Sequence, residues 1–257
     1  MLVIVKKNYK EISIEGAKII ADRLRKKPDL VMGFATGSTP LGLYKELIRM
    51  HKNEGLDFSK VTTFNLDEYV GLPPTHDQSY HYFMYENLFN HINIDQRFIH
   101  IPHGMAKDIN AFCDWYENQI IECGGIDLQI LGIGANGHIA FNEPGSSLGS
   151  RVRIKTLTEK TRDDNARFFK SMTEVPKYAI TMGVGTVMDA KEIILLANGE
   201  NKANAIEAAL EGPITAMCPA TIVQMHRNVF VLLDKQAGSK LKGNYVDSWE
   251  SKVISYH

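Results

Sequence analysis

The loop from Gly132 to Glu143 holds the side chains of this sequence that are best suited to move protons. It follows a short apolar run and places Asn136, His138 and Glu143 within eight residues, among glycines. The apolar run is typical of a buried strand, which would deliver these polar groups to one end of a sheet. A packing motif has no evident use for an imidazole, a carboxamide and a carboxylate in one loop, whereas a reaction with proton transfers does.

Two adjacent carboxylates, Asp67 and Glu68, follow another apolar run, Val61 to Asn65. Carboxylates just past a buried strand are costly unless they are solvated or used. Neighbouring side chains on an extended segment point to opposite sides, so one can face a cleft while the other finds a structural partner. Asp67 is nearer the strand end and is the candidate for the cleft. An exposed acidic turn is the alternative.

A third polar segment has the features of an anion site. It lies between the run Leu30 to Phe34 and a helical pattern, and its residues are Thr36, Gly37, Ser38 and Thr39. Gly37 lets the backbone turn, Pro40 suits the first helical position, and Ser38 or Thr39 suits the N-cap. Free N–H groups at a helix start, with these hydroxyls, would bind an anion such as phosphate. A capped helix without a ligand fits this loop equally well.

Two cations are further candidates for a phosphate. Lys202 opens a helical pattern after the run Ile193 to Ala197, where a cation opposes the helix dipole unless an anion is near. A solvated surface lysine is the alternative. Arg167 is a weaker candidate when it is read alone.

The elements that must position these residues alternate along the chain. Short β-branched runs predict strands at Leu2–Val5, Leu30–Phe34, Val61–Asn65, Asp127–Leu131, Tyr178–Met182, Ile193–Ala197 and Val229–Leu233. Helical patterns lie between them, at Glu15–Lys26, Pro40–Glu54, Ile109–Cys123, Lys160–Phe169 and Asn201–Leu210. This alternation predicts an α/β fold with an open, doubly wound, mostly parallel sheet covered by helices on both faces. In such sheets ligands bind beyond the carboxyl ends of the strands, where all the polar segments above would lie.

The composition limits the class of protein. The 257 residues are 44% hydrophobic and 23% charged, with a net charge of −1, which argues against nucleic-acid or anionic membrane partners. No apolar run is long enough to span a membrane, and we expect a cytoplasmic protein. Cys113, Cys123 and Cys218 match neither a disulfide framework nor a zinc site, so we expect reduced, buried thiols. The histidines show no metal spacing and Gly132-x-Gly134-x-x-Gly137 does not open a helix, so we expect no metal and no dinucleotide cofactor.

No linker or repeat divides the chain, and we expect residues 1–257 to form a single domain. The polar segment 156–176 is the exception, because it reads as a helical excursion over the sheet rather than as part of it.

Long ordered motifs now make a resemblance visible. Residues 35–40 read Ala-Thr-Gly-Ser-Thr-Pro, residues 64–72 read Phe-Asn-Leu-Asp-Glu-Tyr-Val-Gly-Leu, and residues 132–144 read Gly-Ile-Gly-Ala-Asn-Gly-His-Ile-Ala-Phe-Asn-Glu-Pro. Residues 150–158 and 175–186 match as well. With these motifs the chain closely resembles the glucosamine-6-phosphate deaminases of the sugar-phosphate isomerase-like superfamily, over about Leu30 to Leu233.

The resemblance implies a reaction and a role for each residue. The family converts D-glucosamine 6-phosphate and water to D-fructose 6-phosphate and ammonia. By resemblance, His138 opens the sugar ring, Glu143 orients His138, and Asp67 moves the proton from C2 to C1. The phosphate would rest on residues 36–39 with Arg167 and Lys202 as charge partners, and residues 156–176 would form a lid that carries Arg167.

One residue departs from the family pattern. Many members carry Asp where this chain has Asn136, which can orient an imidazole by hydrogen bonding but supplies no charge. We therefore expect His138 to lose its proton more readily here than in relatives with the Asp.

Some members are hexamers activated by N-acetylglucosamine 6-phosphate. Ser146, Arg153 and Lys155 match residues of that effector site. The C-terminal region that completes the site looks shorter and different here, which argues against an effector response. The resemblance leaves the chain a monomer or a homo-oligomer.

Two other functions fit the fold. A 6-phosphogluconolactonase also binds a six-carbon sugar phosphate, but it needs no base at C2, so Asp67 argues against it. A sugar-phosphate-sensing effector domain of a transcription regulator would bring a helix-turn-helix, for which we see no room before Leu30.

Overall fold

The computed structural model describes residues 1–166, 169 and 171–248. In this part of the chain seven strands form one sheet in the order β1-β10-β9-β6-β2-β3-β5, with parallel pairing throughout. The strands are β1 (Leu2–Lys6), β2 (Val31–Phe34), β3 (Thr62–Asn65), β5 (Ile99–His100), β6 (Leu128–Gly132), β9 (Glu192–Ala197) and β10 (Val229–Asp234). The predicted α/β fold with a parallel sheet is therefore confirmed.

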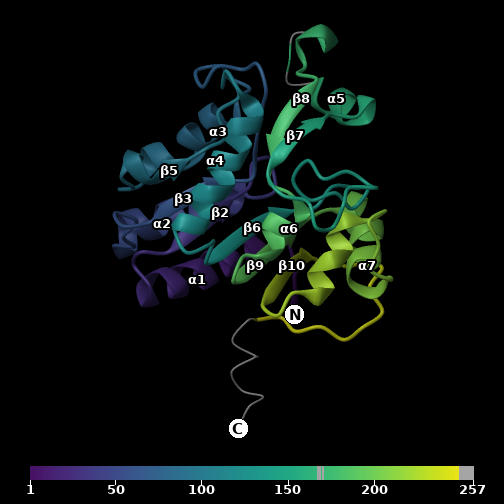
Figure 1. Ribbon diagram of the computed structural model, residues 1–257. Helices are drawn as coiled ribbons and strands as arrows, with labels where there is room; N and C mark the ends of the chain where they lie inside the picture. Colours follow the sequence, from purple (N-terminus) through teal and green to yellow (C-terminus); the bar gives the residue numbers. More distant parts are fainter. Residues whose placement is uncertain (167–168, 170, 249–257) are drawn as a thin grey trace.

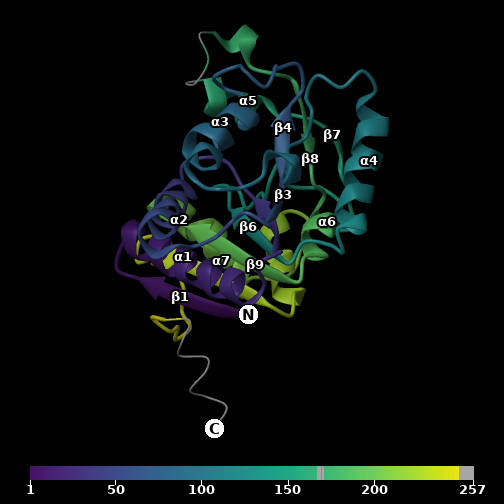
Figure 2. The same cartoon turned by 90° about the vertical axis from the view of Figure 1, so that its left-hand side faces the viewer.

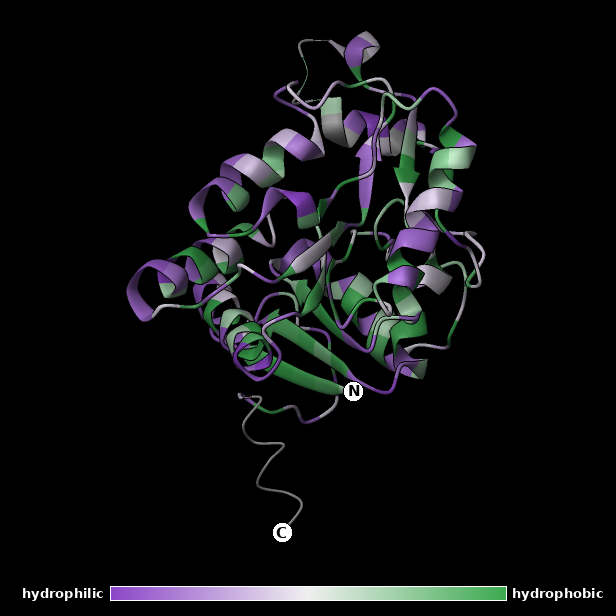
Figure 3. Ribbon diagram, turned by 60° about the vertical axis from the view of Figure 1, so that its left-hand side comes forward, coloured by the Kyte–Doolittle hydropathy of each residue, from purple (hydrophilic) through white to green (hydrophobic). Residues whose placement is uncertain are grey.

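The longer strands of the main sheet are largely apolar on both faces. Every residue of β2 and β10 is buried, and Figure 3 shows most of the long strands in the green of hydrophobic residues. Two-sided burial is the expected state of parallel strands that helices cover from both sides. Figure 2 shows this layering, with α2 and α3 on one side of the strands and α4 and α6 on the other.

The helices are α1 (Tyr9–Lys26), α2 (Leu41–Glu54), α3 (Tyr80–Asn87), α4 (Ile109–Glu122), α5 (Glu159–Ala166), α6 (Val184–Met188) and α7 (Ala203–Glu211). Short 3-10 turns are η1 (Phe89–His91), η2 (Gln96–Phe98), η3 (Met172–Glu174), η4 (Glu200–Lys202) and η5 (Pro219–Met225). None of the helices in the described ranges is long and apolar enough to cross a bilayer.

Helix α1 begins earlier than the hydrophobic pattern predicts. It starts at Tyr9 rather than Glu15, because the Asn8 side chain accepts the N–H of Glu11 at 3.0 Å and the Glu11 carboxylate accepts the N–H of Lys7. This reciprocal capping satisfies the free N–H groups of the first turn.

A second, small sheet stands apart from the main one. It has the order β4-β8-β7 and antiparallel pairing, and its strands are β4 (Asp67–Tyr69), β7 (Arg153–Thr156) and β8 (Tyr178–Thr181). The strand predicted at Tyr178–Met182 exists, but it belongs to this sheet rather than to the parallel one. β4 and β7 were not predicted, because each is short and carries charged residues.

The excursion of residues 156–176 leaves and returns through this small sheet. Helix α5 and turn η3 lie between β7 and β8, and Figure 1 shows them beyond these strands, away from the main sheet. The helix predicted at Lys160–Phe169 is present as α5, whose last residue is Ala166. Its predicted continuation reaches residues that lie outside the described ranges.

After β10 the chain passes along β1, the edge strand that pairs with β10. The backbone N–H of Val5 in β1 donates to the carbonyl of Val246 at 3.0 Å, and Ile4 and Val246 form a parallel bridge. Glu211 at the end of α7 fixes the same segment, because its carboxylate accepts the backbone N–H groups of Lys242 and Gly243.

The three cysteines are unbonded, as predicted, but they are not all buried. Cys113 and Cys218 are buried, whereas Cys123 is exposed at the turn that ends α4.

Candidate active site

Four neighbouring strands of the main sheet deliver the predicted site segments to one edge. In the order β9-β6-β2-β3, their carboxyl ends lead into residues 198–202, 133–143, 35–39 and 66–68. The chain winds outward from β2 in one direction through β3 to β5 and continues at β6 on the other side. The crevice at such a reversal of strand order is the usual ligand site of an open α/β sheet.

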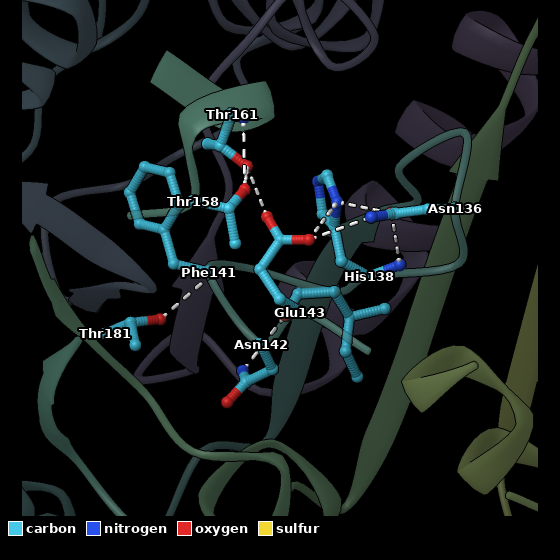
Figure 4. Close-up of polar contacts among 9 residues, drawn as sticks. Asn136, His138, Phe141, Asn142, Glu143, Thr158, Thr161 and Thr181 are labelled. Carbon is cyan, nitrogen blue, oxygen red and sulfur yellow. Dashed lines mark hydrogen bonds and ion pairs between the residues drawn. The ribbon is translucent and has the colours of Figure 1, made fainter. Parts of the chain in front are cut away.

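Asn136 connects His138 to Glu143 (Figure 4). Its Nδ2 donates to Glu143 Oε2 at 2.8 Å, and its Oδ1 lies 2.7 Å from His138 Nδ1. The direct distance from His138 Nδ1 to Glu143 Oε2 is 3.7 Å, an ion-pair distance rather than a hydrogen bond. Glu143 thus acts on the imidazole mainly through Asn136.

This arrangement decides which imidazole nitrogen carries a proton. A carboxylate only accepts hydrogen bonds, so Asn136 must turn its NH₂ group to Glu143 and its oxygen to His138. That oxygen also accepts the backbone N–H of His138 at 3.2 Å. Nδ1 of His138 must therefore carry a proton, and in the neutral ring Nε2 is then the nitrogen that can accept one.

The backbone of the loop is shaped around the imidazole. A Cβ at Gly134 would lie 2.2 Å from His138 Cε1, so only glycine leaves room for the ring. Among the described residues, Ala140 is the one non-glycine with positive φ, at 49°. Strain of this kind is found where the surrounding structure holds a functional loop in place.

The Glu143 carboxylate also accepts a hydrogen bond from the excursion of residues 156–176. The Thr161 hydroxyl in the first turn of α5 donates to Glu143 Oε1. Thr158, just before the helix, accepts the N–H of Thr161 at 3.1 Å and donates its own hydroxyl to Thr161 Oγ1 at 2.9 Å. Figure 4 shows Glu143 between these threonines and Asn136.

Asp67 and Glu68 have different surroundings, as the alternating pattern predicts. The Glu68 carboxylate accepts the backbone N–H groups of Tyr69, Tyr80 and His81 at 2.8, 3.0 and 2.9 Å. Tyr80 and His81 open α3, so Glu68 lies at a helix N-terminus and has a structural role.

The Asp67 carboxyl is buried, with 6% of the residue exposed, and no described group donates a hydrogen bond to it. Burial, with a smaller contribution from the Glu68 charge, raises the pKa of Asp67 to about 8. Aromatic residues around β4 exclude water from this side of the site, since the Tyr80 and Phe141 rings stack at 6.1 Å and Tyr69 lies 5.7 Å from Phe141. A buried carboxyl with a raised pKa is the usual form of a general base or acid.

Strand β8 joins the two acid–base segments. Asp67 is in register with Thr181, whose hydroxyl accepts the backbone N–H of Phe141 at 3.2 Å. The Asn142 side chain donates to the carbonyl of Met182 at 2.9 Å, and the N–H of Met182 donates to the carbonyl of Leu66. These bonds fix Asp67 and the loop of His138 to the same backbone.

The start of α2 differs from the prediction. The N-cap residue of α2 is Pro40, which makes no side-chain capping bond, so the expected N-cap role of Ser38 or Thr39 is wrong. The Tyr9 hydroxyl takes this place: it accepts the N–H of Gly42 at 2.7 Å and lies 2.9 Å from the Thr39 carbonyl and 3.0 Å from that of Ser38.

This contact leaves the loop available to a ligand. Gly37 has φ +99° and open space around its Cβ position, so the backbone there can approach a bound group. The hydroxyls of Ser38 and Thr39 make no hydrogen bond with the described residues, and both side chains remain accessible.

The remaining predicted residues lie near the same edge or on β7. Lys202 ends η4, immediately before α7, so it precedes the α-helix rather than lying within its first turn. Arg167 lies outside the described residues.

Arg153 and Lys155 share one side of β7, and the Arg153 guanidinium donates to Asn142 Oδ1 at 2.7 Å. Ser146 is buried, and its hydroxyl has no partner among the described residues. In the same part of the chain no three His, Cys, Asp or Glu side chains are grouped to hold a metal.

Three residues of this site were not predicted from the sequence: Thr161, Tyr9 and Thr181. Each acts through a contact distant along the chain, and no local pattern signals such a contact.

Comparison with known proteins places this geometry in a family. Residues 9–232 match the family described as glucosamine-6-phosphate isomerases/6-phosphogluconolactonase. The chain belongs to this family. A protein of Thermoanaerobacter sp. (strain X514) named glucosamine-6-phosphate deaminase is 55% identical over 239 residues, 93% of this chain and 94% of its own. A protein of Clostridium perfringens (strain 13 / Type A) with the same name is 52% identical over 242 residues, 94% of this chain and all of its own.

Solved structures agree with this placement. One described as a monomeric glucosamine-6-phosphate deaminase has a TM-score of 0.91 and 46% identity, covering 93% of this chain and 99% of its own. A 6-phosphogluconolactonase from Trypanosoma brucei has a TM-score of 0.75 at 21% identity, covering 93% and 98%, and shows the shared fold alone.

Proposed function

We propose that the chain is a glucosamine-6-phosphate deaminase, which converts D-glucosamine 6-phosphate and water to D-fructose 6-phosphate and ammonia. Relatives of this name match more than nine-tenths of the chain at above 50% identity. The structural observation that carries the proposal is the pair of separate acid–base groups: a buried Asp67 carboxyl with raised pKa, and a His138 imidazole whose Nδ1 is held by Asn136.

His138 opens the pyranose ring. Its Nε2 takes the proton of the anomeric hydroxyl and returns it to the ring oxygen as the bond from C1 to that oxygen breaks. Asn136 and Glu143 keep Nδ1 protonated and stabilise the charge that the imidazole carries between the two transfers.

Asp67 then moves a proton between adjacent carbons. Its carboxylate takes the proton from C2 while one proton of the substrate ammonium group passes to the C1 oxygen, which gives an enolamine. The carboxyl then returns its proton at C1, which gives the protonated imine of fructose 6-phosphate. Water adds to that imine and ammonia leaves, so the reaction needs no redox partner. A substrate ammonium group near Asp67 lowers the pKa of the carboxyl and favours the ionised base.

The phosphate binds at the start of α2, on Thr36, Gly37, Ser38 and Thr39, with Lys202 and Arg167 as cationic partners. Support comes from the position of this loop beside β6 and from the accessible hydroxyls of Ser38 and Thr39. For Arg167 the support is the family motif alone. The excursion of residues 156–176 acts as a lid within a single domain.

One coupled assay tests the proposal against its nearest alternative. Ammonia release from glucosamine 6-phosphate, measured with glutamate dehydrogenase, is expected, together with no hydrolysis of 6-phosphogluconolactone. Lactone hydrolysis without ammonia release would overturn the proposal. Adding N-acetylglucosamine 6-phosphate to the same assay tests Ser146, Arg153 and Lys155 as effector residues.

A further inference from the structure

We propose that Thr161 is a positioning residue that aligns the ring-opening histidine through Glu143, so that ring opening requires helix α5 to be docked on the site. The inference rests on the proposed deaminase function. It assigns a role in the reaction to a hydroxyl of the excursion that makes no contact with the reacting imidazole in the hydrogen bonds described above.

The direction of each hydrogen bond in this network is determined at Glu143. Both oxygens of a carboxylate only accept, so the Thr161 hydroxyl must donate to Oε1 just as Asn136 Nδ2 donates to Oε2. With its proton committed to Glu143, Thr161 can only accept from Thr158. The donor and the acceptor of each hydrogen bond in the chain from Thr158 to His138 are therefore fixed.

Burial makes the contribution of Thr161 large. Thr161 is 8% exposed, and the Glu143 side chain is 11% exposed. Water cannot easily replace a donor that is removed from such a carboxylate, so Oε1 would lose a hydrogen bond to a charged group. Helix α5 brings this donor, because Thr158 caps the helix by accepting the N–H of Thr161.

Loss of the Thr161 hydroxyl changes the state of the imidazole. A Glu143 with one donor fewer binds a proton more readily, and a protonated Glu143 can donate to Asn136. The carboxamide can then turn its NH₂ group toward Nδ1, which moves the imidazole proton to Nε2 and blocks that nitrogen as the base. This sequence predicts lower turnover, and a stronger loss at low pH.

Three variants separate this role from a purely structural one. Thr161→Val keeps the shape but removes the hydroxyl, and we expect kcat for ammonia release to fall by about 10- to 100-fold with KM within about threefold. We also expect the acid limb of its kcat profile to move to higher pH. Thr161→Ser keeps the hydroxyl and should retain kcat within about threefold on the same reasoning. Thr173→Val is the matched control, since Thr173 is exposed in the excursion and its hydroxyl bonds only Ser171 among the described residues.

A second measurement does not depend on activity. Nitrogen-15 NMR of the histidine rings in the wild-type protein should show His138 protonated at Nδ1 in its neutral form, and the Val variant should shift it toward Nε2. Unchanged kcat and pH profile in Thr161→Val, or an equal loss in Thr161→Ser, would overturn the role of Thr161. If Thr161→Val does not fold, the Ser variant and the wild-type tautomer decide the matter, and a wild-type Nε2 tautomer overturns the proposal. Absence of ammonia release by the wild type would instead contradict the deaminase function and leave the tautomer result standing.

Discussion

Replacing Asp67 with Asn tests the proposed base in two independent ways. The variant keeps the size of the side chain but can neither take a proton from C2 nor carry charge in its buried site. We therefore expect it to bind glucosamine 6-phosphate and to leave the C2 proton unexchanged with solvent. We also expect it to be more stable than the wild type at neutral and alkaline pH.

The magnitude of the stability change follows from burial. The pKa of Asp67 rises from 3.8 to about 8 in the folded protein. Below pH 4 the carboxyl is protonated in both states and has no such effect, whereas between pH 4 and 8 unfolding releases its proton, so the wild type loses stability as pH rises. At about 1.4 kcal/mol per pKa unit the upper bound is about 6 kcal/mol. Because part of the effect comes from Glu68 and relaxes with it, we expect about 2 kcal/mol, or about 5 °C in Tm, by pH 8.

The assays are direct. Proton NMR in D₂O follows the C2 signal of the substrate, calorimetry measures its binding to the inactive variant, and thermal unfolding is recorded from pH 4 to 9. Asp29→Asn is the control, because Asp29 is exposed in a turn. Exchange at C2 that persists in the Asp67 variant would refute its role as the base. A difference in Tm that stays constant across this pH range would refute the argument from burial.

Three further changes probe the surrounding groups. Asn136→Asp places a second carboxylate about 2.8 Å from Glu143. If the new carboxylate is ionised, we expect the acid limb of kcat/KM to move to higher pH by about 1 unit. An unmoved limb would mean that residue 136 has no electrostatic influence on the imidazole. Glu68→Gln removes the charge beside Asp67, so we expect the pKa of Asp67, and the part of the acid limb that it sets, to move to lower pH. We also expect a Tm several degrees lower, because Gln serves three N–H donors poorly. Tyr9→Phe removes the hydroxyl that holds the start of α2. We expect KM and the inhibition constant of inorganic phosphate to rise together by about 5-fold, with kcat within about twofold. An unchanged inhibition constant of phosphate would contradict a link between Tyr9 and the loop of residues 36–39.

Most of the main sheet could be predicted because its signals are local. Runs such as Ile193–Ala197 are apolar, short and bounded by polar residues, and parallel strands need no other pattern. Each polar segment follows its strand directly, so the meeting of Asp67 and His138 at one sheet edge follows from the fold class.

The small sheet and the connections within the site could not be predicted in this way. β4 and β7 contain charged residues and acquire their pairing only from β8, which is more than 20 residues away from β7 and more than 100 away from β4. The roles of Tyr9 and Thr161 depend on contacts 30 and 18 residues apart. The sequence pattern correctly separated Asp67 from Glu68, since alternation along an extended segment is a local property.

The return of the chain to β1 limits how copies of this protein can associate. An edge strand with free N–H and C=O groups is a template on which a second chain can add a strand. Here the carbonyl of Val246 accepts the backbone N–H of Val5 on β1, and the strand at the opposite edge, β5, has only two residues. Edges of this kind offer little backbone of the main sheet for continuous pairing between subunits, so an assembly of this chain is not expected to form by extending that sheet.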